Sequence, residues 1–535
     1  MMKRSVRSIL SKINKRRSIS MAAALISLSY LLSRLLGLVR DRLLASNFGL
    51  SPQADAYAAA FRIPDLLFTL LVSGAFAVSF IPVFVGFLER KKVDEAWEVA
   101  STLLNLLVLV TAVFGVFSFI FAEPLVKLIA PGFDAERMEL TVHLTRILLI
   151  TPLFFAISAI FGAIQQAFQR FVLFALASVF YNIGIIFGIL FLEPLFAQPI
   201  YGVAWGVVAG TALQAIMQSF GLVGLGFRYS FSIKFWHPAV IRVLKLMVPR
   251  SLDLGIEQVN TIVETAIGSQ LAAGSLSSYY FANNLKNVPL GLFGGAIATA
   301  VFPTLIRASK SKDKHRLPNE IVRTLSLVLF LIVPSMAVTV VMRGYIVRLL
   351  LGFGDQTTAD TLGWFAGVIV AQSLFFVVAR IFYALEDTKT PLFTSIFTLF
   401  INIPLSYLFA RMFGTPGLAM ALSLVTSIEL IILMFLLRRK IGPYGGRSIL
   451  RTAVRTSLAT LVMASVMYMM IVSLFPLLRG DVGWRTLGPK FAFICTVGVF
   501  VYFFATKLLR VKEADMVLRL VKSRYRKRLR KHIGA

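Results

Sequence analysis

The sequence predicts an all-α polytopic membrane protein with about fourteen transmembrane helices. Of its 535 residues, 58% are hydrophobic and 15% are charged, whereas soluble domains are about 45–50% apolar and about 25% charged. Apolar stretches of the roughly 20 residues that span a bilayer recur along the chain. The fourteen spans are centred near residues 33, 73, 109, 153, 182, 213, 259, 292, 330, 373, 401, 427, 462 and 498.

Basic residues between the spans predict the orientation. The formal net charge is +30, and the segment up to Arg17 holds seven basic residues and no acid. Cytoplasmic loops carry an excess of Lys and Arg, and here the loops after even-numbered spans are the basic ones. We therefore expect both termini in the cytoplasm and an uncleaved first span, because Arg34 interrupts the apolar run that follows the basic start.

Several classes of function are not expected. One cysteine, Cys495, excludes an intrachain disulfide framework, and the four scattered histidines have no metal-ligand spacing. No phosphate-binding loop of the form G-x-x-x-x-G-K-[ST] occurs, so we expect neither a cofactor nor direct use of ATP. The positive charge lies between apolar spans, so we do not expect a nucleic-acid partner.

An internal repeat predicts two lobes. Gly74-Ala75-Phe76-Ala77 with Pro82 recurs as Gly295-Ala296-Ile297-Ala298 with Pro303, an offset of 303 − 82 = 221. Two further matches share this offset, which helix packing by small residues does not explain. Six spans per repeat make the lobes parallel, related by a pseudo-two-fold axis, as in transporters that bind substrate between their halves. The predicted regions are 1–18 (basic tail), 19–225 (N-lobe), 226–440 (C-lobe), 441–510 (two extra helices) and 511–535 (basic tail).

Charges inside the first span mark a candidate site. A charge at bilayer depth costs roughly 2.5–3.5 kcal/mol on insertion scales, yet this span carries Ser33, Arg34, Arg40 and Asp41. Residues seven apart are nearly eclipsed on a helix, so Ser33 and Arg40 share one stripe and Arg34 and Asp41 the next. This pattern favours a membrane site for an anionic ligand. The alternative is an ion pair between Arg34 and a carboxylate on another span.

Later spans carry further polar residues. The seventh holds Arg250, Asp253, Glu257 and Glu264, where Arg250 and Asp253 are spaced for a local ion pair. The two glutamates are candidates for Na⁺ or H⁺ coupling, or for a structural or substrate-facing role. Lys286 in the eighth span is a candidate second-lobe cation for the same ligand.

Two cytoplasmic segments have simpler interpretations. Asp387 lies in the turn before Pro391, where it or Thr388 would cap the next helix; a gating role is the alternative. Gln165, Gln166 and Arg170 fall at the equivalent place in the first lobe. The basic C-terminal run, with Tyr525, suits a helix on anionic phospholipids, and a simple retention charge explains it equally well.

The motifs together resemble the MurJ (MviN) family of lipid II flippases, in the superfamily of multidrug, oligosaccharidyl-lipid and polysaccharide exporters. They are S-R-x-L-G-x-x-R-D from Ser33, D-A-Y from Asp55, G-A-F-x-x-x-F-I-P from Gly74, Y-G-V-A-W-G from Tyr201 and F-Y-A-L-x-D-T-x-T-P from Phe382. The resemblance implies a non-enzymatic transporter in the bacterial cytoplasmic membrane. Its substrate would be the undecaprenyl-pyrophosphate-linked peptidoglycan precursor.

The resemblance also implies roles for individual residues. Ser33, Arg34, Arg40, Asp41 and Asp55 match positions that the family uses around a central cavity, and Arg62 matches one usually held by Lys. A pyrophosphate suits Arg donors. We expect the cavity to be lined by the first, second, seventh and eighth spans, and the protein to act as a monomer, with cell-wall synthesis proteins as further partners.

Two departures keep alternatives open. Phe68 and Asn284 stand where the family commonly has Arg. Arg62, Arg250 or Lys286 would compensate, or the substrate is another polyprenyl-linked oligosaccharide. An exporter of amphipathic drugs would need a cavity lined by acids and aromatics. A non-transporting scaffold in envelope synthesis is the remaining hypothesis.

Overall fold

The structure, a computed structural model, describes residues 19–72, 75–231, 233–478, 480–481 and 483–515. It is built from helices, with no strand among these residues. The helices form two compact units, which divide between Ser277 and Ser278. The predicted basic tails lie outside the described part, 1–18 completely and 511–535 from residue 516 on.

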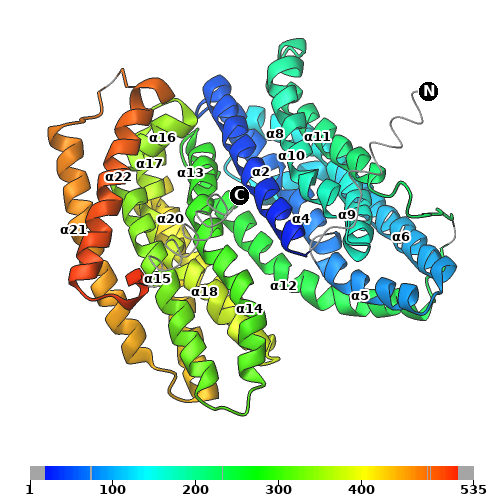
Figure 1. Ribbon diagram of the computed structural model, residues 1–535. Coiled ribbons are helices and arrows are strands. Elements are labelled where there is room, and N and C mark those ends of the chain that lie inside the picture. The colour runs from blue at the N-terminus through cyan, green and yellow to red at the C-terminus, as the bar shows by residue number, and fades with distance from the viewer. Residues whose placement is uncertain (1–18, 73–74, 232, 479, 482, 516–535) are drawn as a thin grey trace, which may run out of the picture. The chain divides into compact units, whose positions relative to one another are not determined.

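The first unit contains α2 to α12 (Figure 1). Its elements are α2 (Ile19–Phe48), α3 (Pro52–Ala60), α4 (Arg62–Leu71), α5 (Ala75–Glu89), α6 (Val93–Ile120), α7 (Ala122–Ile129), α8 (Ala135–Leu148), α9 (Thr151–Ala167), α10 (Phe171–Phe187), a π-helix η1 (Gly188–Leu192), a short 3-10 turn η2 (Glu193–Leu195), α11 (Ile200–Phe220) and α12 (Pro238–Gly268). Side-chain caps start several of them: Ser51 accepts from Ala54 N at the start of α3, and Asp134 from Arg137 N at the start of α8.

An aromatic column forms the core of the first unit. Phe76, Phe80 and Phe84, four residues apart on α5, stack with ring centroids 5.2 and 5.0 Å apart, and Phe84 meets Trp97 of α6 at 5.3 Å. All four side chains are buried. Spacing of four keeps them on one helix face. The column holds α5 against α6 and α9, and α12 packs along α4 and α5.

The second unit contains α13 to α22. Its elements are α13 (Ser275–Pro289, of which the first three residues belong to the first unit), a π-helix η3 (Leu290–Gly295), α14 (Ala296–Ser309), α15 (Arg316–Val341), α16 (Arg343–Leu351), α17 (Gln356–Trp364), α18 (Ala366–Ala384), α19 (Lys389–Phe413), α20 (Thr415–Ile441), α21 (Gly446–Ser473) and α22 (Trp484–Leu508).

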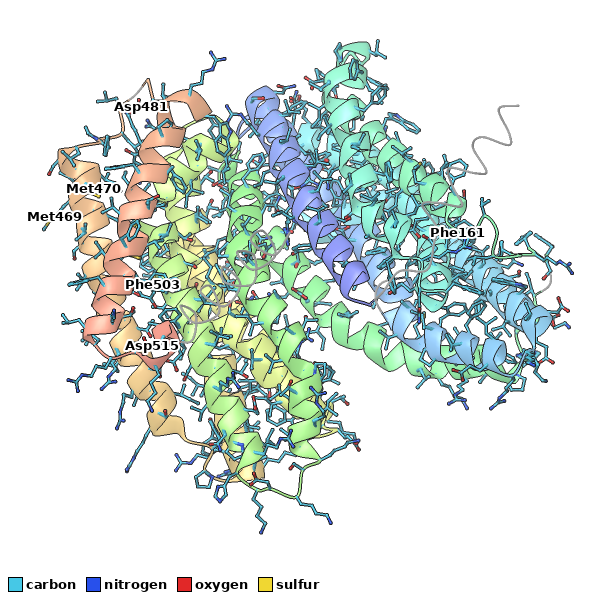
Figure 2. The ribbon with its side chains drawn as sticks, in the orientation of Figure 1. Phe161, Met469, Met470, Asp481, Phe503 and Asp515 are labelled. Atoms are coloured by element: carbon cyan, nitrogen blue, oxygen red, sulfur yellow. The ribbon has the colours of Figure 1, made fainter. Side chains whose placement is uncertain are left out.

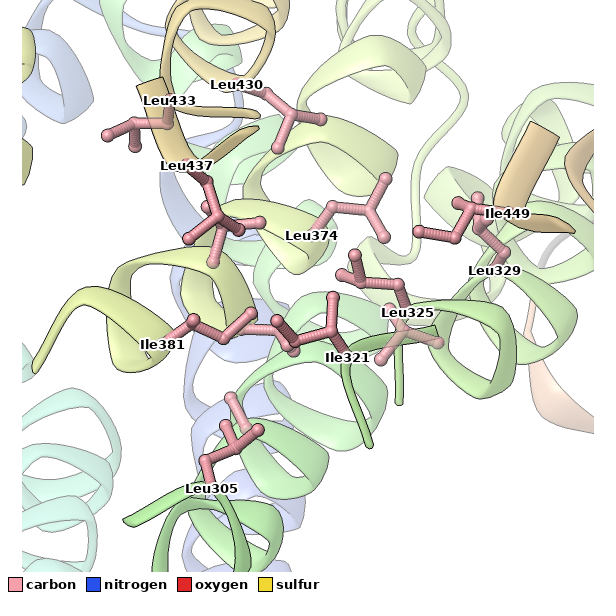
Figure 3. Close-up of a cluster of buried hydrophobic side chains, with 14 of the residues drawn as sticks. Leu305, Ile321, Leu325, Leu329, Leu374, Ile381, Leu430, Leu433, Leu437 and Ile449 are labelled. Atoms are coloured by element: carbon pink, nitrogen blue, oxygen red, sulfur yellow. The ribbon is translucent and has the colours of Figure 1, made fainter. Parts of the chain in front are cut away.

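Aliphatic side chains form the core of the second unit. Leu325 of α15, Leu374 and Ile381 of α18, and Leu433 of α20 lie in one cluster (Figure 3). The last two helices pair with each other and pack on α15 and α16. On α21 the neighbours Met470 and Met469, labelled in Figure 2, are 8% and 65% exposed. This helix therefore has one face toward protein and one apolar face outward, as expected beside lipid.

The predicted fold class is confirmed. Twelve helical segments among the described residues are long and apolar enough to cross a membrane. α2 and α12, with 30 and 31 residues, are long enough but are not among the twelve. They correspond to the first and seventh predicted spans.

The boundary between the two units, after Ser277, differs from the predicted boundary between the lobes. α12 packs with the first unit, although the sequence repeat starts a second lobe at residue 226. The repeat reflects sequence similarity and the unit reflects packing, so the predicted lobe boundaries stay a prediction.

Candidate substrate-binding site

Asn182 of α10 joins the two ends of the first predicted stripe on α2. Its Nδ2 donates to Ser33 Oγ (3.2 Å) and to the Ser33 carbonyl (3.3 Å), and its Oδ1 accepts from Arg40 Nη1 (3.3 Å). One amide can reach both because Ser33 and Arg40 lie two turns apart on one face. That shared face, predicted from the spacing, is confirmed. We call Ser33, Arg40, Asp41 and Asn182 the α2–α10 seam.

Glycines place α10 so that Asn182 can reach α2. A Cβ on Gly184 would lie 2.1 Å from Gly210 Cα, and one on Gly188 would lie 2.4 Å from Gly206 Cα. Any side chain at these positions would force α10 and α11 apart. Small residues permit such close approach in membrane helices. Close packing of α10 against α11 thus fixes the position of Asn182.

Arg40 is held by a neighbouring acid. Its Nη2 and Nε lie 2.7 and 2.9 Å from Asp41 Oδ1, and Asp41 is only 4% exposed. A buried carboxylate in such a pair is costly to leave without its cation. Asp41 therefore orients the guanidinium and compensates part of its charge, so an anionic ligand would have to compete with it.

Arg34 lies on the exposed side of α2. Its Nη2 and Nε donate to Tyr30 Oη at 3.1 and 3.2 Å, and its Cζ lies 5.4 Å from the Tyr30 ring centroid. The second predicted stripe is thus divided between an exposed Arg34 and a buried Asp41. Leu28, Leu31 and Leu35 of this helix are exposed, whereas Leu44 and Ala45 near its end are buried.

Asp55 caps a helix. The carboxylate is 1% exposed and accepts from the backbone N–H groups of Gly274 and Ser277, both at 2.7 Å. These groups are at the N-terminus of α13, where backbone donors have no partner within the helix. The negative charge also suits the positive end of the helix dipole. In this structure both carboxylate oxygens of Asp55 are engaged in that cap.

Arg62 and Phe68 lie on α4. Arg62 Nε is buried without a hydrogen-bond partner among the described residues. A donor in that state is costly and is suited to an anionic acceptor. Phe68 packs on Phe155 of α9, with ring centroids 4.7 Å apart. An arginine at position 68 would have to replace this aromatic contact.

The acids of α12 have different surroundings. Glu264 is 5% exposed and its Oε1 accepts from Asn260 Nδ2 at 3.1 Å, whereas Glu257 is exposed. The helix includes Arg250 and Asp253, but their side chains lie outside the described part. Their predicted ion pair stays a prediction.

Lys286 is buried in the second unit. It is 5% exposed, and its Nζ lies 4.6 Å from the ring centroid of Phe365. A cation over an aromatic face is attracted by the negative face of the ring. This contact keeps the ammonium inside the protein on α13.

Asp387 has the capping role predicted from the sequence. Its Oδ1 accepts from Thr390 N at 3.0 Å, Oδ2 accepts from Thr390 Oγ1 at 2.8 Å, and Lys440 Nζ contacts Oδ2. Burial works against its ionisation, but the Lys440 ammonium and the Thr390 hydrogen bonds outweigh it and lower the pKa to about 2. The predicted gating role of Asp387 stays a prediction.

The structure thus brings Ser33, Arg40 and Asp41 together and gives Asp55 and Asp387 capping partners. Sequence reasoning missed Asn182. A signal was available, because Asn182 is an amide inside the apolar tenth-helix string Phe180-Tyr181-Asn182-Ile183. Among the described residues no group of His, Cys, Asp and Glu could hold a metal ion.

A protein-family model described as Lipid II flippase MurJ matches residues 44–480. The probable lipid II flippase MurJ of Thermotoga maritima is 30% identical over 501 residues, covering 92% of this chain and 97% of that protein. The lipid II flippase MurJ of Burkholderia cenocepacia is 30% identical over 451 residues, covering 82% and 87%.

Solved structures share the fold. A lipid II flippase MurJ in an inward closed conformation superposes with a TM-score of 0.75 at 24% identity, covering 91% of this chain and 98% of that one. An inward-facing multidrug resistance MATE family transporter of the MOP superfamily gives 0.65 at 14% identity, covering 79% and 98%. Because both structures are less than 25% identical to this chain, the similarity shows a shared fold.

Proposed function

The chain belongs to the lipid II flippase MurJ family, and we propose that it moves lipid II from the inner to the outer leaflet of the bacterial cytoplasmic membrane by alternating access. The observation that carries this proposal is the family match over residues 44–480, which includes parts of both units. Lipid II ends its polyprenyl chain in a pyrophosphate, so a flippase must shelter negative charge within the membrane.

We propose that Arg34, Arg40 and Arg62 contact the pyrophosphate, with Ser33 beside them. Arginine matches phosphate oxygens bidentately. Arg62 supports this role because its Nε is buried without a hydrogen-bond partner among the described residues. Asp41 would orient Arg40 until substrate replaces part of that contact. Lys286 is the proposed cation of the second unit.

Asp55 is proposed as a structural member of this machinery. Its carboxylate holds the first turn of α13 by two backbone hydrogen bonds. A residue that anchors the start of the helix bearing Lys286 would act on substrate through position rather than contact.

Energy for transport is proposed to come from an ion gradient or the membrane potential. Moving one charge through the potential is worth about 2.3 kcal/mol per 100 mV, enough for more than a tenfold bias. Asp253, Glu257 and Glu264 are the proposed Na⁺ or H⁺ groups, and Arg250 modulates them. Collapsing both gradients at constant ATP should stop exposure of lipid II at the outer face, and Glu257→Gln should have the same effect. Unchanged flipping after the collapse would contradict this mechanism.

We further propose a monomeric secondary transporter without covalent catalysis, with both termini in the cytoplasm. The basic loops and tails would contact anionic phospholipids, and cell-wall synthesis proteins are the expected protein partners. Cysteine labelling from each side of the membrane tests the orientation.

The function is tested by complementation and reconstitution. The gene should restore growth of a bacterium depleted of its own lipid II flippase, and the purified protein should expose labelled lipid II at the distal leaflet of liposomes. Phe68 favours one alternative, another polyprenyl-linked oligosaccharide, because an aromatic pair occupies the place of a cation. Failure with lipid II together with transport of such a glycan would establish that alternative.

A further inference from the structure

Glu429 is a carboxylate in the middle of a membrane span. It is the fifteenth residue of α20, which has 27 residues, and apolar residues flank it on both sides. It is half-buried inside the second unit. An ionisable group at this depth is costly and marks a functional site by default, and the proposed pyrophosphate site does not use it.

A serine from the neighbouring helix contacts this carboxylate. Ser395 Oγ donates to Glu429 Oε1 at 2.7 Å. A hydroxyl both donates and accepts, so the same pair also suits a protonated glutamate, whose O–H would donate to Ser395 Oγ. The contact therefore survives a change of protonation without rearrangement of either helix.

Polar residues run along α19 beside this pair. Thr394, Thr398, Asn402 and Ser406 are spaced by four and are 5%, 3%, 1% and 0% exposed. Thr398 Oγ1 donates to the Ser395 carbonyl at 3.1 Å, and Ser406 Oγ donates to Asn402 Oδ1 at 3.1 Å. We call these four residues, Ser395 and Glu429 the α19–α20 seam. It lines one helix face with groups that can exchange protons or hold water.

Ionisable residues on the helices packed against α20 would affect the protonation of Glu429. These helices are α17, α18 and α19, and their ionisable residues are Asp360, Arg380, Tyr383, Lys389, Tyr407 and Arg411. Asp360 pairs with Arg343 at 3.3 Å, Arg411 stacks on Tyr407 at 4.4 Å, and Arg380 lies 5.7 Å from the Phe302 ring on α14. On α20 itself, Lys440 contacts Asp387 and Arg438 and Arg439 lie in the last turn. Arg380 lies nearer the middle of its helix than the other cations, so it is the one that a test must control.

We propose that Glu429 with Ser395 is a proton-exchange site of the second unit. The carboxylate takes a proton from water and becomes a neutral acid, and it returns that proton on ionisation. No other bond forms or breaks. That this exchange is coupled to lipid II movement rests on the proposed flippase function, whereas the exchange itself does not.

The site is tested first without substrate. Infrared difference spectra of the full-length protein in liposomes, titrated between about pH 5 and pH 9, should show a protonated-carboxyl band that disappears in Glu429→Gln. Ser395→Ala should move its midpoint by about one pH unit, because a hydrogen bond to the carboxylate is lost. Ser427→Ala is the matched control, since Ser427 Oγ bonds the Ser423 carbonyl of its own helix and should leave the midpoint unchanged.

Two results would overturn the proposal. One is a set of spectra identical in wild type and Glu429→Gln. The other is loss of folded protein in Glu429→Gln that Arg380→Gln restores, which would make Glu429 half of a structural ion pair. If Glu429→Gln fails to fold, Glu429→Asp keeps a titratable group, and its band must then shift.

Coupling is tested by the rate of lipid II flipping against pH. Wild type should change rate across the infrared midpoint, and Glu429→Gln should lose that dependence and flip at least about tenfold more slowly. A persistent carboxyl band with no flipping in any variant would leave the proton site intact and refute the flippase function. Equal pH profiles in wild type and Glu429→Gln would overturn the coupling.

Discussion

The α2–α10 seam of the first unit and the α19–α20 seam of the second both place polar side chains between membrane helices, but they differ in the charged groups that they contain. The first contains Arg40 and Asp41, bridged to Ser33 by an amide. The second contains one carboxylate, Glu429, among hydroxyl and amide groups. Arginine keeps its charge at every physiological pH, whereas a carboxyl group is charged only when it is ionised. The first seam is therefore suited to holding an anion and the second to exchanging a proton.

Removing an arginine from the first unit should have the largest effect. Arg34→Ala or Arg40→Ala should abolish complementation while leaving the protein in the membrane, because each lost charge-assisted contact to phosphate costs about 1.5–3 kcal/mol. Arg34→Lys should be partly active, since an ammonium cannot form the bidentate fork. Arg411→Ala, a cation stacked on Tyr407 in the second unit, is the control. Normal growth of Arg34→Ala would refute the phosphate contact.

Substitution of Asp55 tests a structural role for a buried acid, in contrast to the proton-exchange role proposed for Glu429. Asp55→Ala should lower the free energy of unfolding by about 1–3 kcal/mol, because it leaves buried backbone N–H groups of Gly274 and Ser277 without an acceptor. Asp55→Asn should lose less, since its amide keeps one acceptor oxygen. Thermal unfolding in detergent measures both. A variant as stable as wild type would show that the cap contributes nothing.

Asn182→Leu tests whether the bridge in the first seam serves Arg40. Loss of the amide removes hydrogen bonds of about 1 kcal/mol each, so lipid II flipping should fall by roughly tenfold while expression is retained. The control is Ser158→Ala, which removes the acceptor of a partly buried hydrogen bond that Gln214 Nε2 donates elsewhere in the first unit. Equal losses in both variants would assign Asn182 a packing role only.

Asp387, in the turn before α19, should show the smallest effect. Its folded pKa of about 2 lies below the usual 3.8, so its stabilisation is present above about pH 4 and is lost as pH falls toward 2. Asp387→Asn should cost about 1 kcal/mol or less at pH 7, and that difference should be smaller at pH 3 and lost as the pH falls through about 2. Chemical unfolding at pH 7 and pH 3 measures it. Glu386→Gln, whose exposed partner is Lys310, should change little at either pH.

The turns that contain Arg170 and Asp387 lie at equivalent places in the sequence repeat, and their structures can be compared. Both turns contain a residue with positive φ, Gln169 at 58° and Glu386 at 61°. In the first unit Arg170 donates to the Val223 carbonyl at 2.7 Å, beyond the end of α11. In the second, an acid contacts Lys440 in the last turn of α20. The equivalence predicted the position of the turn, but not the partner that its charged residue contacts.

Periodicity and hydropathy determined the helical fold class and the stripe shared by Ser33 and Arg40, because these depend on residues close in the chain. The motifs were enough to indicate the family. Partners distant in sequence were decided only by tertiary structure: Asn182 lies 142 residues from Arg40, and Gly274 lies 219 residues from Asp55. The sequence likewise places Glu429 in an apolar span, but only the structure places Ser395 of the neighbouring helix against it. Spacing defines which face of a helix a side chain occupies, whereas packing decides what that face meets.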